Sequence, residues 1–385
     1  MESRFGTSGT LGILGGGQLG KMLLAAAARW DVHPAVLDPD PECPCSKWTS
    51  LFKVGDLNEA DAVRSFGAGC ATVTIEIEGV STEALADLER QGIKVYPRPE
   101  TIRLIQDKGL QKQFFSQHQL PTSDYVLYDG IEVLREDVAQ GRRKLPLVWK
   151  SRKGGYDGRG VSVIHKPETL NALPDVPCLV ESVVPIEREL ACVAARNADG
   201  EIALYPVVGM EFHPEANQVE IVHLPSGADA TLEQQVLDLS RQILEGLQHV
   251  GLLAIEFFAT RDGRILINEM APRPHNSGHL FNEAAECSQF EMHLRAVLNL
   301  PLGSTQVEKA AAMVNLVGAE GHSGPVHYVG VEAVLAEPGA YLELYGKTQT
   351  RPFRKMGHLI LLDESLEAVL AKARRFQHTI QVHSR

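Results

Sequence analysis

Two glutamates near residue 260 are spaced so that a hairpin brings their carboxylates together. Residues 251–260 and 264–269 are mostly apolar and flank Asp262-Gly263, a dipeptide that favours a two-residue hairpin turn. With that turn, Glu256 faces Glu269 directly at roughly 5 Å. Opposed carboxylates in apolar surroundings need a proton or a cation, and Mg²⁺ binds through few protein carboxylates plus substrate phosphate oxygens. The pattern favours a metal site over two glutamates at a solvated strand end.

A lysine followed by a glycine-rich loop indicates phosphate chemistry. Residues 147–150 form an apolar run that ends in Lys150, and residues 153–160 contain four glycines. Free backbone N–H groups in such a loop can cover phosphates, and a lysine ammonium can supply a point charge. The alternative is a long solvated hairpin turn.

A second glycine motif lies near the N-terminus. Gly15-Gly16-Gly17-Gln18-Leu19-Gly20 fits G-x-G-x-x-G, and Asp38 lies about where a ribose-binding acid is expected. A P-loop is excluded because Met22 stands where a magnesium-binding Ser or Thr is needed. Three interpretations stay open: a dinucleotide site, a site for another phosphate ligand, or a tight strand–helix turn without a ligand.

Strands and helices alternate through the first hundred residues. Apolar runs predict strands at 10–14, 34–38, 52–54, 71–77 and 93–95, with intervening helices of which two are capped by Asn58 and Ser81. Short joints between them predict a parallel sheet covered on both faces. Ligands of such sheets bind at the carboxyl ends of the strands, which draws attention to the glycine motif, Asp38, Glu76 and Glu78.

From about residue 121 the pattern changes to strands joined by glycine-rich segments. Hairpins are expected at 188–207 and 251–270, helices at 231–247, 288–299 and 366–376, and strands near 311–317 and 326–335. Near the C-terminus, four basic residues gather within nine positions: Lys347, Arg351, Arg354 and Lys355. Because the chain is acidic overall, this cluster suggests an anion site; the alternative is a solvated basic loop.

The composition excludes several classes of protein. The 385 residues carry 37 basic and 49 acidic side chains, a net charge of −12, which predicts two or three globular domains and disfavours nucleic-acid binding through a general basic field. The apolar runs are too short to span a bilayer and residues 1–10 lack a signal pattern, so we expect a cytoplasmic protein with no membrane partner. Six scattered cysteines predict reduced thiols.

The order of these features resembles the ATP-grasp superfamily. More narrowly, residues 12–376 resemble the 5-(carboxyamino)imidazole ribonucleotide synthase family. The matching motifs include Thr74-Ile75-Glu76-Ile77-Glu78, Gln106-Asp107-Lys108, Asn268-Glu269, Arg273-Pro274-His275-Asn276-Ser277-Gly278-His279 and Arg354-Lys355-Met356-Gly357-His358. The resemblance implies an α/β ATP-grasp fold with an N-terminal parallel-sheet domain (1–107), an ATP-grasp domain (108–300, lid about 118–178) and a small C-terminal domain (301–385).

The resemblance also implies an activity. It is that of an ADP-forming carbon–nitrogen ligase, which uses ATP, Mg²⁺ and bicarbonate to carboxylate 5-aminoimidazole ribonucleotide in purine biosynthesis, through carboxyphosphate. A homodimer is implied as well. One alternative is another ribonucleotide ligase of the same fold, such as formate-dependent glycinamide ribonucleotide transformylase. An NAD oxidoreductase is disfavoured because its fingerprint explains none of the residues after 100.

The site residues follow from the family motifs. The resemblance implies ATP contacts from Lys108, Lys150, Gly155, Tyr156, Asp157, Gly158, Arg159, Gly160, Val161, Glu181, Ser182, Val183, Val184, Glu189, His213, Asn268 and Glu269. Magnesium is assigned to Glu256, Asn268 and Glu269, and catalysis to Arg273, His275, Asn276 and Asp157, of which the first three form the bicarbonate pocket. Ribonucleotide contacts are assigned to Gln18, Glu76, Glu78, Tyr156, Arg159, Lys347 and Arg354, the last two at its phosphate.

Overall fold

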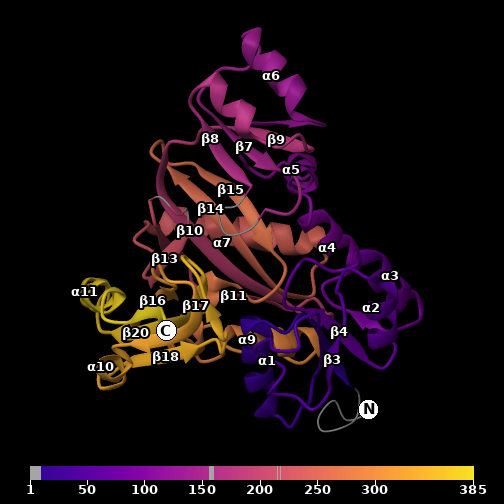
Figure 1. Ribbon diagram of the computed structural model, residues 1–385, viewed down its shortest axis with the longest axis vertical. Coiled ribbons are helices and arrows are strands. Elements are labelled where there is room, and N and C mark those ends of the chain that lie inside the picture. Colours follow the sequence, from indigo (N-terminus) through magenta and orange to yellow (C-terminus); the bar gives the residue numbers. More distant parts are fainter. Residues whose placement is uncertain (1–9, 156–159, 215, 217) are drawn as a thin grey trace.

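The structure is a computed structural model that describes residues 10–155, 160–214, 216 and 218–385. A long central sheet runs through the molecule, with a small separate sheet at one end (Figure 1). At the opposite end, the N-terminal α/β unit and the C-terminal strands lie on either side of the base of this sheet (Figure 1). None of the helices in the described part of the chain is long and apolar enough to cross a membrane.

The predicted N-terminal parallel sheet is confirmed. Its strand order is β3-β2-β1-β4-β5, with β1 (Leu11–Leu14), β2 (Ala35–Asp38), β3 (Phe52–Val54), β4 (Thr72–Ile75) and β5 (Lys94–Val95). The helices of this unit are α1 (Gln18–Ala28), α2 (Ala60–Gly67), α3 (Thr82–Arg90) and α4 (Pro99–Ile105). Ser81 caps α3 as predicted. The prediction that Asn58 caps α2 is wrong, because Glu59 holds the cap position and the amide of Asn58 bonds to Asp56.

The central sheet is antiparallel at every pairing and continues without a break into the C-terminal part of the chain. Its order is β15-β14-β10-β12-β13-β16-β20-β18, and β11 pairs with β10. The strands are β10 (Ile186–Arg196), β11 (Ile202–Leu204), β12 (Val208–Phe212), β13 (Val219–Leu224), β14 (Gly251–Thr260), β15 (Ile265–Ala271), β16 (Ala310–Val317), β18 (Ala340–Leu344) and β20 (Lys355–Asp363). This continuity joins the hairpin glutamates to the strand that begins at Lys355.

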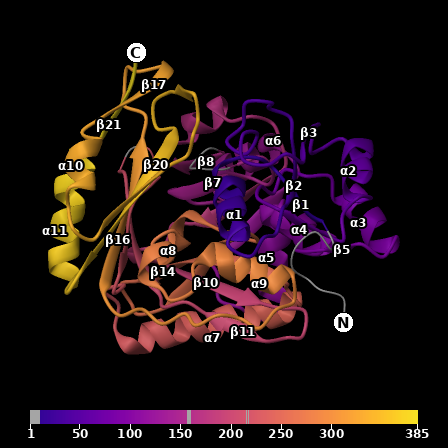
Figure 2. The ribbon, with the colours of Figure 1, turned by 90° about the horizontal axis from the view of Figure 1, so that it is seen from below.

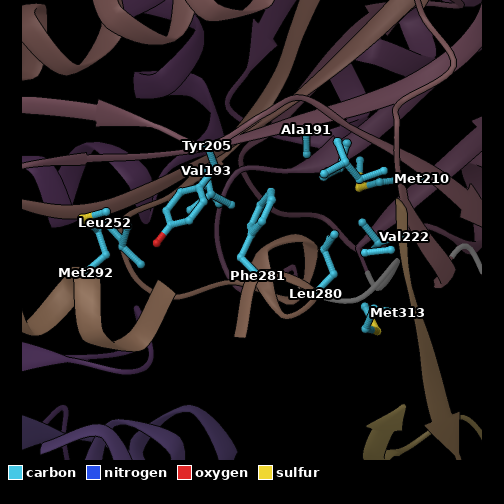
Figure 3. Packing of buried hydrophobic residues seen from close by; sticks show 14 of the residues in the cluster. Ala191, Val193, Tyr205, Met210, Val222, Leu252, Leu280, Phe281, Met292 and Met313 are labelled. Carbon is cyan, nitrogen blue, oxygen red and sulfur yellow. The ribbon is translucent and has the colours of Figure 1, made fainter. Parts of the chain in front are cut away.

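Helices cover both faces of the central sheet. α7 (Ala230–Leu247) packs on one face, while α8 (Phe281–Ala284) and α9 (Gln289–Val297) pack on the other (Figure 2). In the α8 cluster, the rings of Tyr205 and Phe281 stack with centroids 4.5 Å apart (Figure 3). Leu280 is buried in the same cluster, so the end of the segment that follows β15 is fixed in the core.

The small sheet has the order β6-β9-β7-β8 and is also antiparallel. It comprises β6 (Tyr125–Tyr128), β9 (Cys178–Ser182), β7 (Leu147–Ser151) and β8 (Val161–Ile164), and α5 (Lys108–Gln117) precedes it. α6 (Ile131–Ala139) and η1 (Pro167–Ala172) cover one face through apolar packing. Because strand side chains alternate, Lys150 and Glu181 point to the opposite face, toward the hairpin.

The remaining C-terminal elements form a three-stranded sheet and two helices. The strands are β17 (Gly324–Val329), β19 (Gln349–Thr350) and β21 (Gln381–Ser384), and the helices are α10 (Val331–Leu335) and α11 (Leu366–Gln377). The strand predicted at 326–335 is therefore wrong in its second half. Gly330, at φ +84°, turns the chain out of β17 and into α10.

Candidate active site

The β14–β15 hairpin brings the predicted metal ligands together, in the predicted register at Ile255 and before it but shifted by one residue nearer the turn. The pairs are Ile255 with Met270 and Phe257 with Ile267, so two residues of β15 lie opposite one residue of β14. This β-bulge sets Asn268 and Glu269 together against Glu256. The amide of Asn268 lies 3.4 Å from a carboxylate oxygen of Glu256. The bulge thus gathers three oxygen-bearing side chains where the prediction had two facing each other.

The register differs because the turn is longer than predicted. Thr260 N donates to Arg264 O, so the loop has three residues, with Gly263 in the left-handed region at φ +79°. Asp-Gly suits this loop as well as the two-residue one, since a three-residue hairpin loop also places glycine in that region. The extra loop residue shifts the strand pairing by one residue. The bulge at Glu256 compensates for this shift, so Ile255 and Met270 pair as predicted.

Lysines from two other elements complete the cluster. Lys108, the first residue of α5, forms an ion pair with Glu269. Lys150 on β7 donates to Oδ1 of Asn268 at 3.1 Å and lies 2.5 Å from Oε2 of Glu181. The small sheet, α5 and the hairpin therefore meet at one group of charges, as the phosphate and metal assignments require.

The two hairpin glutamates differ in their affinity for protons. Burial, together with the charges of Glu269 and Glu189, raises the pKa of Glu256 to about 8. Lys108 holds the pKa of Glu269 down at about 2. Burial also raises the pKa of Glu189, on the adjacent strand β10, to about 7. Glu256 therefore carries a proton at neutral pH when no metal ion lies beside it.

The donor set fits magnesium. Carboxylate and amide oxygens are hard ligands, and Mg²⁺ takes only one or two protein carboxylates because substrate phosphates and waters fill its other positions. Within the described residues, no group of three or more His, Cys, Asp and Glu side chains forms a dedicated metal cage. A metal ion that is shared with substrate phosphates needs few protein ligands. Glu256, whose charged form needs a positive neighbour, suits such a site.

One residue that the sequence reasoning missed is Lys112, whose side chain is only 3% exposed. It forms an ion pair with Glu181 and donates to the hydroxyl of Ser123 at 3.0 Å. Burial lowers the pKa of Lys112 to about 8. Burial also acts to raise the pKa of Glu181, but Lys150 and Lys112 outweigh it and bring that pKa to about 2. The available signal was the spacing of Lys108 and Lys112, which places both on one face of a helix.

The N-terminal glycine motif proves to be closed. Gly16 N donates to Oδ2 of Asp38 at 2.6 Å, so Asp38 is not available as the ribose-binding acid. Gly17 N and Gly20 N donate to the two oxygens of Glu76 at 3.0 and 3.1 Å. The Glu76 carboxylate stands where a phosphate lies in a dinucleotide site. The structure therefore favours the third interpretation, a turn without a ligand.

The predicted bicarbonate residues are only partly brought together. Arg273 pairs with Glu78 at 2.9 Å, and His275 Nε2 lies 3.9 Å from Oε1 of Glu256. Asn276, in contrast, forms a reciprocal amide pair with Asn315 at 2.8 and 2.9 Å. Arg273 and His275 thus border the charged cluster, whereas the Asn276 amide is held by β16.

The basic loop near the C-terminus lies within electrostatic range of the same cluster. The charge of Lys355 acts to lower the pKa of Glu256. Lys355 belongs to the basic cluster predicted from the sequence, although the family resemblance assigned it no contact. Lys347 donates to the carbonyl of Lys355 at 2.8 Å, and Arg354 donates to the carbonyl of Gln349 at the same distance. His213, predicted near the nucleotide, lies with its ring 5.5 Å from that of Phe353 in this loop.

Other predicted residues lie around or beyond this cluster. Tyr156, Asp157, Gly158 and Arg159 lie outside the described residues. Gly155 and Gly160 border that stretch, Val161 pairs with Lys150, and Gln18 begins α1. Ser182 and Val183 are exposed and line a hollow of about 610 Å³ with residues 141–147, and Val184 follows them.

Three families match successive parts of the chain. Residues 9–106 match the ribonucleotide synthetase preATP-grasp domain, residues 113–290 the ATP-grasp domain, and residues 311–372 the phosphoribosylaminoimidazole carboxylase C-terminal domain. The chain is 37% identical over 361 residues to the N5-carboxyaminoimidazole ribonucleotide synthase of Synechococcus elongatus, covering 91% of this chain and 89% of that protein. It is 35% identical to the phosphoribosylaminoimidazole carboxylase of Ogataea methanolica, over 93% of this chain but only 67% of that longer protein.

Solved structures agree with these matches. The N5-carboxyaminoimidazole ribonucleotide synthetase from Thermotoga maritima is similar with a TM-score of 0.90 and 38% identity, covering 98% of this chain and 100% of that one. The ATP complex of the Aspergillus clavatus enzyme has a TM-score of 0.87 and 30% identity, covering 96% and 97%. The chain has the α/β ATP-grasp fold and belongs to the N5-carboxyaminoimidazole ribonucleotide synthase family.

Proposed function

We propose that the protein is an ATP-dependent carbon–nitrogen ligase that carboxylates 5-aminoimidazole ribonucleotide in purine biosynthesis, with bicarbonate as the carbon source. The observation that carries the proposal is the convergence of Lys108 and Lys150 on Glu256, Asn268 and Glu269. A related structure, 29% identical, holds ADP and the aminoimidazole ribonucleotide together, which supports the choice of substrate.

The ATP phosphates are proposed to lie between Lys108 and Lys150. To bind them, Lys108 exchanges Glu269 for a phosphate oxygen, and Lys150 exchanges Glu181. Glu269, together with Glu256 and Asn268, would then be available to hold Mg²⁺. The bound ion would neutralise charge on the phosphates during transfer. By family resemblance, residues 181–184 lie at the adenine and Glu189 at the ribose.

Bicarbonate needs activation because it is a poor electrophile. Its oxygen attacks the γ-phosphorus and ADP leaves, which forms carboxyphosphate. The exocyclic amine then attacks the carbon, phosphate departs, and the amine gives up a proton. Arg273 can hold a planar carbonate with two parallel hydrogen bonds, and His275 lies beside the phosphate-binding cluster. The resemblance assigns Tyr156, Asp157 and Arg159 to the imidazole side of this pocket.

The basic loop is proposed to hold the ribonucleotide 5′-phosphate. Arg354→Ala should weaken ribonucleotide binding about 10- to 150-fold, since a charge-assisted contact is worth roughly 1.5–3 kcal/mol. The neighbouring Arg351→Ala is the matched control, because Arg351 is exposed and outside the assigned contacts. If Arg354→Ala weakened ATP binding as much as ribonucleotide binding, the loop would belong to the ATP site instead.

Phosphate release under omission of single substrates tests the proposed function. With ATP and Mg²⁺ present, release should require bicarbonate and rise when aminoimidazole ribonucleotide is added. Turnover that depends on formate and glycinamide ribonucleotide would contradict the proposal. The family resemblance also leads us to propose a homodimer, which light scattering would test.

A further inference from the structure

We propose that Gln289 is a positioning residue for the bicarbonate pocket, acting through His275. Gln289 is the first residue of α9, and its side chain is completely buried. Its Oε1 accepts from His275 N at 2.9 Å, and its Nε2 donates to His275 O at 3.0 Å. Both peptide groups of His275 are thereby held by one side chain.

A third hydrogen bond fixes the orientation of the Gln289 amide. Nε2 also lies 2.8 Å from Nδ1 of His279. With the amide reversed, Nε2 would face the N–H of His275, donor against donor, so only one orientation satisfies all three contacts. His279 must then accept at Nδ1 and carry its proton on Nε2. Burial lowers the pKa of His279 well below its usual value, which is consistent with this neutral ring.

The surroundings leave Gln289 no alternative position. A β-carbon on Gly278 would lie 2.5 Å from Oε1 of Gln289, so glycine is needed for the amide to approach. Ser288 caps α9, and Phe290 and Met292 anchor it in two apolar clusters. A side chain held this rigidly can fix the backbone of a loop that contains no regular secondary structure before Asn276.

The effect of Gln289 should fall on bicarbonate rather than on ATP. His275 lies between Gln289 and the hairpin, with Nε2 3.9 Å from Glu256, and Arg273 is two residues away. The phosphate-binding lysines come from α5 and β7, whereas the hydrogen bonds of the Gln289 side chain described above go to His275 and His279. A loosened loop would therefore misplace the carbonate-binding groups and leave the ATP contacts in place.

The inference rests on the proposed function, and bicarbonate kinetics of the full chain test it. Gln289→Leu removes all three hydrogen bonds at similar volume. We expect the bicarbonate KM to rise at least tenfold, with the ATP KM within twofold of wild type. Gln289→Glu keeps the acceptor to His275 N but sets an oxygen against His275 O and His279 Nδ1, so it should also raise the bicarbonate KM at least tenfold while the ATP KM stays within twofold.

His293→Leu is the matched control. His293 lies one turn further along the same helix, is fully buried, and bonds to Thr74 and to Leu252 N rather than to His275. It should lower Tm as Gln289→Leu does, yet leave the bicarbonate KM within twofold. Equal changes in the ATP and bicarbonate KM of both Gln289 variants, or no change, would overturn the positioning role. A wild-type enzyme that ignores bicarbonate would instead overturn the proposed function.

Discussion

The glycine motif and the β14–β15 hairpin both contain buried carboxylates, yet the two regions bind them in different ways: Glu76 follows the end of β4, whereas Glu256 and Glu269 lie within their strands. In the glycine motif, Glu76 is bonded to the backbone N–H groups of Gly17 and Gly20. In the hairpin, the bulge sets Glu269 and Asn268 together against Glu256, and lysine side chains supply the counter-charge. The carboxylate of the glycine motif is bound by backbone N–H groups, whose positions the fold fixes. The carboxylate of Glu269 is bound by a lysine side chain, which can change its rotamer and its partner.

This difference separates a structural site from a ligand site better than residue type does. A backbone N–H is fixed by the fold, so breaking its bond to a carboxylate leaves a buried polar group unsatisfied. Lys108 can exchange Glu269 for phosphate and keep a charged partner throughout. We infer that exchangeable partners, rather than buried acids as such, mark the reactive part of this molecule.

The largest effect that the comparison predicts is on ATP turnover. Glu269→Gln should reduce turnover at least 100-fold, because it removes the charge that the metal needs and the partner that Lys108 must release. Unfolding temperature should change little, since the lost ion pair with Lys108 is offset by relief of the repulsion between Glu269 and Glu256. Near-normal turnover at saturating Mg²⁺, measured by phosphate release, would refute the metal assignment.

A substitution in the glycine motif should instead lower stability and leave ATP binding unchanged. In Gly17→Ala, the new β-carbon would lie 2.7 Å from Oε1 of Glu76, so the carboxylate must shift. We expect a loss of about 1–3 kcal/mol in the free energy of unfolding, measured in urea, because overpacking strains the turn. The ATP KM should stay near that of wild type. A selective loss of ATP affinity would show that the motif binds nucleotide after all.

A third expected effect is a pH dependence of stability. The folded pKa of Glu256, about 8 without metal, lies above its unfolded value, so the wild type loses stability as pH rises from about 4.5 to 8. Glu256→Gln lacks this loss. The free energy of unfolding of the variant, relative to that of the wild type, should therefore rise by at most about 1.4 kcal/mol per pH unit in that window. Above pH 8 the difference should stay constant.

Urea unfolding of both proteins in EDTA, between pH 5 and 9, would measure this gain. The lowered pKa values of Glu269 and Glu181, each about 2, act only in more acidic solution. The raised pKa of Glu189, about 7, acts in the same window in both proteins, so the difference between the two stability curves is the quantity that reports on Glu256. Stability curves that run parallel throughout would contradict a raised pKa of the Glu256 carboxyl in the folded protein.

The sequence predicted the parallel sheet, the hairpin and the residues of the charged cluster because these depend on local periodicity and on motifs. It missed the bulge, since the Asp-Gly turn permits two loop lengths and only the packing of β15 decides between them. It left the glycine motif open because the carboxylate that fills it, Glu76, lies 59 residues beyond Gly17. Lys112 was missed because its role appears only when the small sheet brings Glu181 to it.

Transfer of oxygen from bicarbonate to phosphate tests the central claim most directly. The enzyme would be supplied with ATP, Mg²⁺, aminoimidazole ribonucleotide and ¹⁸O-labelled bicarbonate, and the released phosphate analysed by ³¹P NMR before the label exchanges with water. If bicarbonate attacks the γ-phosphorus, each phosphate carries one oxygen from bicarbonate. Phosphate without that label, formed at the same rate as the carboxylated product, would contradict activation through carboxyphosphate.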